Sequence, residues 1–119
     1  MGWIREIVLD CADPPALAAF WAALLGGRPT EWYPGWVTLE PPPHGQRLSF
    51  QASDDPPPET GTHFDVLVDD LTAAHEAVLA AGATFVEART SPRPGADGAP
   101  VPWRTYRDPA GHPFCLVVR

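Results

Sequence analysis

The sequence contains no lysine, because all eight of its cationic side chains are arginine. Mechanisms that need a lysine amine, such as Schiff-base formation, are therefore excluded. No apolar run approaches the length that spans a bilayer. The only two cysteines, Cys11 and Cys115, are too few for a disulfide framework, which favours a reducing compartment. No signal-peptide pattern is visible near the start of the chain, so we expect a cytoplasmic location.

Acidic side chains outnumber basic ones by 15 to 8, which gives a formal net charge of -7. This balance argues against nucleic acid or an anionic membrane as a partner. With 119 residues, 45% of them hydrophobic, the chain is long enough and apolar enough to form one domain with a buried core.

The chain carries one pattern twice. Stretches that begin at Glu6 and at His63 each alternate apolar and polar residues, end in an aspartate, and lead into an alanine-rich segment that closes on glycine. The two aspartates, Asp13 and Asp70, are expected to cap helices at equivalent positions. Glu6 and His63 are then equivalent as well, so two ligand-type side chains fall at matching points of two half-modules.

In the first half, Leu17, Phe20, Trp21 and Leu24 follow helical spacing and form one apolar stripe. The expected elements are a strand at 4–11, a helix from Pro14 to a stop at Gly26, and strands at 31–33, 36–40 and 46–52, with a hairpin turn at Pro34-Gly35.

The second half repeats this order. The expected elements are a strand at 63–68, a helix after Asp70 that stops at Gly82, strands at 84–90, 103–107 and 113–118, and a tight turn at 108–111. Prolines cluster at 41–43, 56–58 and 92–102, which indicates stiff loops between the periodic segments.

Neither half can bury a sheet face alone. We therefore predict an α+β fold in which two βαβββ modules, at about 1–55 and 60–119, form curved mixed sheets around a cleft within a single domain spanning 1–119. A parallel doubly wound sheet ranks well below this, because it needs more than two helices.

This order of elements, with its helix caps, helix ends and turns, resembles the vicinal oxygen chelate superfamily, which includes glyoxalase I, extradiol dioxygenases and bleomycin-resistance proteins. Four segments carry the match: residues 10–14, the helix end from Phe20 to Gly26, residues 63–71 and residues 107–114. Together they look most like the small glyoxalase-like domain branch. The resemblance covers nearly the whole chain and implies the glyoxalase/bleomycin-resistance fold and a homodimer.

In metal-using members of the superfamily, the first and last strands of each half supply the ligands. The resemblance carries these positions onto Glu6, Gln51, His63 and Cys115. Cys115 stands where the metal enzymes usually place glutamate, and Gln51 offers a neutral amide. A hard ion such as Mg²⁺ would not choose a thiol, and zinc sites rarely use an amide. The alternative reading of Cys115 is a small buried hydrophobic residue with an inert thiol.

Two functions follow. In one, a divalent metal assists a lyase, isomerase or dioxygenase-like reaction, with Asp10 or Asp65 moving a proton. In the other, the protein binds and sequesters a small organic molecule without metal. Aromatic side chains on the predicted strands suit such a ligand, and Arg104 could pair with an anionic group on it. The aromatic candidates are Trp32, Trp36, Phe50, Trp103 and Tyr106.

Overall fold

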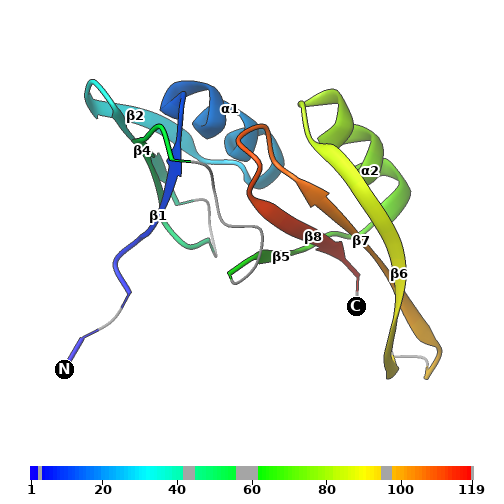
Figure 1. Cartoon of the computed structure of the whole chain (residues 1–119). Coiled ribbons are helices and arrows are strands. Elements are labelled where there is room, and N and C mark those ends of the chain that lie inside the picture. The colour runs from blue at the N-terminus through cyan, green and yellow to red at the C-terminus, as the bar shows by residue number, and fades with distance from the viewer. Residues whose placement is uncertain (3, 42–44, 56–61, 95–97, 119) are drawn as a thin grey trace. The chain divides into compact units, whose positions relative to one another are not determined.

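The structure is a computed structural model that describes residues 1–2, 4–41, 45–55, 62–94 and 98–118. The chain divides into two compact units, Met1–Pro57 and Pro58–Arg119. Each unit contains one helix and one four-stranded sheet (Figure 1). The predicted loops at Pro42-Pro43 and at 56–58 lie outside the described residues.

The first unit is a βαβββ module. Its elements are β1 (Ile7–Cys11), α1 (Pro14–Leu25), β2 (Arg28–Tyr33), β3 (Trp36–Glu40) and β4 (Leu48–Ala52). The strand order is β1-β4-β3-β2, with β1 parallel to β4 and the other pairs antiparallel. A crossover helix is what a parallel neighbour requires, and α1 supplies it.

Helix α1 begins where the sequence predicts. The side chain of Asp13 accepts a hydrogen bond of 3.1 Å from the Ala16 amide, and Pro14 occupies the first turn. The apolar stripe packs on the sheet, and Trp21 is 0% exposed. Burying side chains of this size supplies most of the stability of such a unit.

The second unit has the same order of elements. They are β5 (Phe64–Leu67), α2 (Leu71–Ala80), β6 (Thr84–Pro94), β7 (Pro100–Arg107) and β8 (Pro113–Val117). The strand order is β5-β8-β7-β6, again with one parallel pair, β5 and β8. Asp70 caps α2 by accepting a hydrogen bond of 3.0 Å from the Ala73 amide.

The turn between β7 and β8 is built around Asp108, which is 3% exposed. Its carboxylate accepts hydrogen bonds of 2.9 Å from the amides of Ala110 and His112. An aspartate that bonds the backbone ahead of it in this way fixes a tight turn. The predicted turn is confirmed, and it sets the register with which β8 returns along β7.

Several predicted strand boundaries were wrong. The first strand begins at Ile7 rather than at residue 4, and β2 begins at Arg28 rather than at residue 31. The expected loop over the proline cluster at 92–102 is shorter, because β6 continues to Pro94 and β7 already begins at Pro100. The N-terminal end of β7, from Pro100 to Pro102, pairs only with β6, because the pairing of β7 with β8 begins at Trp103. Proline is tolerated where a strand edge needs no donor, so the prolines did not end the pairing.

The α+β class and the two mixed sheets are confirmed. The single-domain organisation and the cleft between the sheets stay predictions. Across the residues that the structure describes, no helix is both long and apolar enough to cross a membrane.

Candidate functional site

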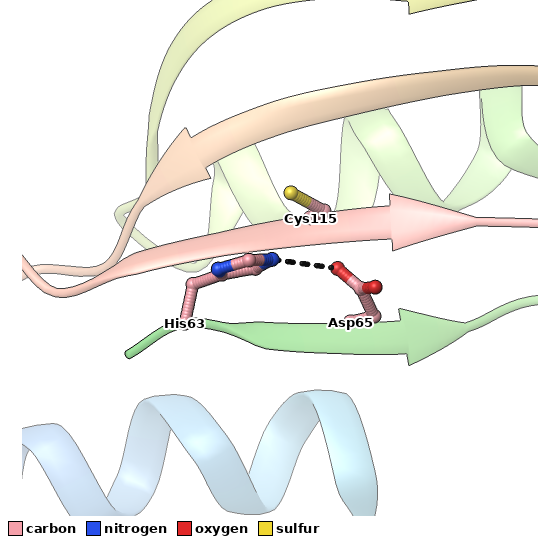
Figure 2. A group of neighbouring side chains, drawn as sticks. All are labelled: His63, Asp65 and Cys115. Carbon is pink, nitrogen blue, oxygen red and sulfur yellow. Dashed lines mark ion pairs between the residues drawn. The ribbon is translucent and has the colours of Figure 1, made fainter. Parts of the chain in front are cut away.

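Three potential metal ligands meet on one face of the second sheet. His63 lies directly before β5, and Asp65 lies in β5 two residues later, so both side chains point the same way. The parallel register places Asp65 beside Cys115 of β8. Figure 2 shows the three side chains gathered around the β5–β8 pair.

Asp65 is the centre of this cluster. Its Oδ1 lies 3.3 Å from His63 Nε2, and its carboxylate accepts a hydrogen bond from the Cys115 thiol. Burial raises the pKa of Cys115 to about 11, and the charge and hydrogen bond of Asp65 act in the same direction. At neutral pH Cys115 is therefore a protonated donor to Asp65 and not a nucleophilic thiolate.

The donor set fits a borderline-soft ion. One atom from each of His63, Asp65 and Cys115 lies within 4.8 Å of the other two. An imidazole, a carboxylate and a thiolate are ligand types that zinc accepts, and three protein ligands leave the open position of a catalytic site. Mg²⁺ prefers oxygen ligands alone. Binding would require the Cys115 proton to leave, which makes metal affinity depend on pH.

A cavity of about 340 Å³ adjoins this cluster and lies within the second unit. That volume is at the lower end for small-molecule sites. His63 and Cys115, two members of the cluster, line this cavity. The other lining residues are Val86, Arg89, Trp103, Thr105, Tyr106, Arg107, Pro113 and Phe114.

Strand alternation explains this lining. Thr105 is opposite Cys115 across the β7–β8 pair, and Trp103 is opposite Arg89 across the β6–β7 pair, so these side chains share the face of the metal-ligand cluster. The Arg89 guanidinium carbon lies 5.5 Å from the centroid of the Trp103 ring. Arg107 donates a hydrogen bond of 3.0 Å from Nη1 to the Gly111 carbonyl.

Arg104 and the ring of Tyr106 lie on the other face, toward α2. The Tyr106 hydroxyl is 2.8 Å from Nδ1 of His75 in that helix, and its ring stacks on Phe114 at 5.3 Å. Burial raises the pKa of Tyr106, while the Arg104 charge opposes the rise. Tyr106 is nevertheless among the residues that line the cavity. Arg104 is not among them, so its role in substrate binding stays a prediction from the sequence.

The remaining predicted residues belong to the first unit. Glu6 accepts a hydrogen bond of 2.7 Å from Ser49, whose hydroxyl is 2.9 Å from that of Thr38. Both hydroxyl-bearing residues are buried, and the sequence pattern did not single them out. The other candidates are placed as follows: Gln51 is exposed and pairs in register with Asp10 and Trp36, Trp36 stacks on Tyr33, Phe50 is fully buried, and Trp32 is exposed.

Only part of the predicted ligand set is brought together within one unit. His63 and Cys115 meet in the second unit, whereas Glu6 and Gln51 belong to the first. The four-ligand arrangement therefore stays a prediction. Asp65 is a direct neighbour of both second-unit ligands, and its role as a proton carrier stays a prediction.

The sequence pattern did not indicate Arg89 as a site residue. Its placement beside Trp103 depends on the β6–β7 register, and nothing local in the sequence gives that register. The signal for Asp65 was present, because a His-x-Asp spacing at a strand start puts both side chains on one face.

Comparison with known proteins supports the fold and the family. The profile of the glyoxalase-like domain matches residues 6–117. A glyoxalase/bleomycin resistance protein/dioxygenase family enzyme from Burkholderia phytofirmans superposes with a TM-score of 0.74 at 16% identity, covering 96% of each chain. A glyoxalase-related enzyme from Fulvimarina pelagi gives a TM-score of 0.71 at 17% identity, covering 100% of this chain and 89% of its own.

TioX from Micromonospora gives a TM-score of 0.67 at 19% identity, with 98% of both chains covered. Identities this low show a shared fold and do not carry a shared reaction. The comparison with functionally curated proteins gives no match. Because the family profile spans almost the whole sequence, the chain belongs to the glyoxalase-like domain family of the vicinal oxygen chelate superfamily.

Proposed function

We propose that this protein binds a small organic molecule on the face of its second sheet that carries His63, Asp65 and Cys115. The observation that carries the proposal is the coincidence of two features on that face. The cavity of about 340 Å³ is lined by His63 and Cys115, the same residues that form the polar cluster with Asp65. A concave site with a few convergent polar groups is the usual form of a small-molecule site.

A ligand screen by NMR tests this proposal. Compounds that bind are expected to shift the amide signals of Trp103, Thr105 and Cys115 together. Trp103→Leu removes stacking area from the cavity lining and should weaken binding about tenfold, a loss of roughly 1.4 kcal/mol. Leu79→Ala, on the exposed side of α2, is the matched control and should leave binding unchanged. Binders that shift only residues outside the cavity would contradict the proposal.

A second candidate function is a metal-assisted lyase or isomerase reaction, and the His63–Asp65–Cys115 cluster favours it. These three side chains would hold a zinc-type ion. When bound, such an ion polarises a substrate oxygen or stabilises developing negative charge. The contribution of the chain itself would be orientation, because Asp65 fixes both His63 and Cys115.

Equilibrium dialysis against Zn²⁺ with elemental analysis separates the two candidates. Stoichiometric zinc that is lost in His63→Ala and Cys115→Ala variants supports the metal-assisted function, with Cys11→Ala as the matched cysteine control. Less than stoichiometric zinc in the unaltered protein at saturating concentration supports metal-free binding.

The same assay decides between two ligand sets. If the second unit holds the ion by itself, Asp65→Ala should abolish binding while Glu6→Ala leaves it intact. If the four-ligand set implied by the superfamily holds, Glu6→Ala should abolish binding instead. The first result is expected here, because Asp65 lies beside both other ligands within one unit.

We also propose that the protein forms a homodimer through β6. This strand is last in its sheet, and its outer edge pairs with no other strand among the described residues. Long exposed edges are templates for pairing with another chain. Antiparallel pairing of two copies about Ala88 would place Glu87 of one copy opposite Arg89 of the other, which is a favourable charge pair.

Sedimentation analysis tests this interface. Glu87→Arg puts like charges opposite each other and should weaken the dimer, whereas the exchange Glu87→Arg with Arg89→Glu should restore it. A dimer that both variants leave unaltered would contradict β6 pairing, and so would a strictly monomeric protein at high concentration.

A further inference from the structure

The lining of the second-sheet cavity is unusual in charge for this chain. It contains two arginines and one histidine, and none of the 15 acidic residues. The whole chain carries a net charge of -7, so the lining is richer in cationic side chains than the chain as a whole. Arg89 and Arg107 come from neighbouring strands, β6 and β7, and both line the cavity.

Each of the two guanidinium groups already donates a hydrogen bond within the protein. Arg89 donates a hydrogen bond of 2.6 Å from Nε to Glu87, and Arg107 donates one of 3.0 Å to the Gly111 carbonyl. A guanidinium has five N–H donors in a fixed fork, which is more than these contacts use. Side chains already fixed in this way lose little conformational entropy when they bind an anion.

Two carboxylates border the cavity on the same face, and each is already bonded. Glu87 pairs with Arg89, and Asp65 accepts from Cys115 and lies beside His63. The positive charge of Arg89 also lowers the pKa of the Cys115 thiol against the effect of burial.

Apart from Thr105 and Cys115, the rest of the lining is aromatic or apolar. Trp103 is half-buried, with the Arg89 guanidinium 5.5 Å from its ring centroid, and Val86 and Pro113 add apolar surface. A tryptophan face binds a planar group by area and stacking. An arginine beside it binds an oxyanion with charge-assisted hydrogen bonds.

From this arrangement we infer that the ligand is a small flat molecule that carries one oxyanion, with its ring against Trp103 and its charge toward Arg89 and Arg107. The inference rests on the proposed function, since it names the class of compound that the same cavity takes. It assigns the charge specificity of the site to Arg89 and Arg107 together.

Calorimetric titration with two matched probes tests the inference. Naphthalene-2-carboxylate has the flat ring and the charge, and naphthalene-2-carboxamide has the same shape without the charge. The carboxylate should bind at least about tenfold more tightly than the carboxamide, because hydrogen bonds to a charged group are the stronger ones. Higher ionic strength should reduce this preference.

Arg89→Gln and Arg107→Gln should each weaken carboxylate binding about tenfold while leaving carboxamide binding unchanged. The carboxamide thus reports that each variant still folds. Arg28→Gln, in the first unit, is the matched arginine control and should alter neither affinity.

Equal binding of both probes at the cavity would overturn the charge inference and leave the proposed function standing. Loss of both probes in the arginine variants would also overturn it, because the arginines would then act on the fold. If neither probe binds the unaltered protein, the inference fails, whereas the proposed function is decided separately by the ligand screen.

Discussion

At the scale of single residues, Asp65 does more than its sequence context indicated. It accepts from the Cys115 thiol and lies 3.3 Å from His63, so it links two side chains that come from different strands. This arrangement keeps Cys115 protonated and inert until something removes its proton. The protonation of the Cys115 thiol therefore depends on burial first and on the neighbouring Asp65 carboxylate second.

The raised pKa of Cys115 makes a prediction about alkaline pH. In the folded protein the thiol holds its proton up to about 11, whereas the ordinary value is 9.0. A folded-state pKa above the unfolded value stabilises the fold at pH values below 9, and that contribution is lost as pH rises toward 11. Chemical denaturation across this range should show falling stability, and Cys115→Ser should show a smaller fall. An identical fall in both would contradict the shift.

The hydroxyl pair Ser49 and Thr38 predicts a non-additive mutant cycle. Ser49→Ala leaves the Thr38 hydroxyl without its partner and removes the donor to Glu6, so it should cost about 1–3 kcal/mol of stability. The double variant Ser49→Ala with Thr38→Val removes both buried hydroxyls and should cost less than the sum of the single changes. Additive costs from denaturant titration would contradict a direct bond between them.

At the scale of elements, the glycine after α1 has a specific steric role. Gly27 has φ +92°, and a Cβ there would overlap the carbonyl oxygen of Glu40. Gly27→Ala should therefore destabilise the first unit by more than the ~1–2 kcal/mol of left-handed strain alone. Gly98→Ala is the matched control, because Gly98 has φ +81° with open space around it. Equal losses of thermal stability would contradict the steric role.

The helix caps form a second matched pair. Asp13 and Asp70 each accept one amide hydrogen bond in the first turn, at 3.1 and 3.0 Å. Replacing either with alanine should cost about 0.5–2 kcal/mol. Asp13→Asn and Asp70→Asn keep the acceptor and should restore most of the loss in thermal unfolding experiments. Failure of asparagine to restore it would indicate that charge, and not the cap bond, is responsible.

At the scale of the whole molecule, the sequence predicted most of the fold because its signals are local. Caps at Asp13 and Asp70, the apolar stripe of α1 and the turn at Asp108 each depend on residues a few positions apart. The repeat of these signals then indicated two modules of the same order.

The site was predicted only in part because it depends on register between distant strands. His63 and Cys115 came from the superfamily pattern, whereas the pairing of Asp65 with Cys115 and of Arg89 with Trp103 arises from long-range hydrogen bonding. Long-range pairing also explains why the β6–β7 hairpin extends further than predicted. The proline cluster alone indicated a loop there, but β6 and β7 pair as far as Pro94 and Pro100.

We infer that one face of the second sheet, around Trp103 and Arg89, binds a flat anionic molecule. A crystal structure of the protein with naphthalene-2-carboxylate tests this most directly. We expect the naphthalene ring to lie against Trp103 and the carboxylate to lie within hydrogen-bond distance of Arg89 or Arg107. Ligand bound at any other surface, with this cavity filled by water alone, would contradict it.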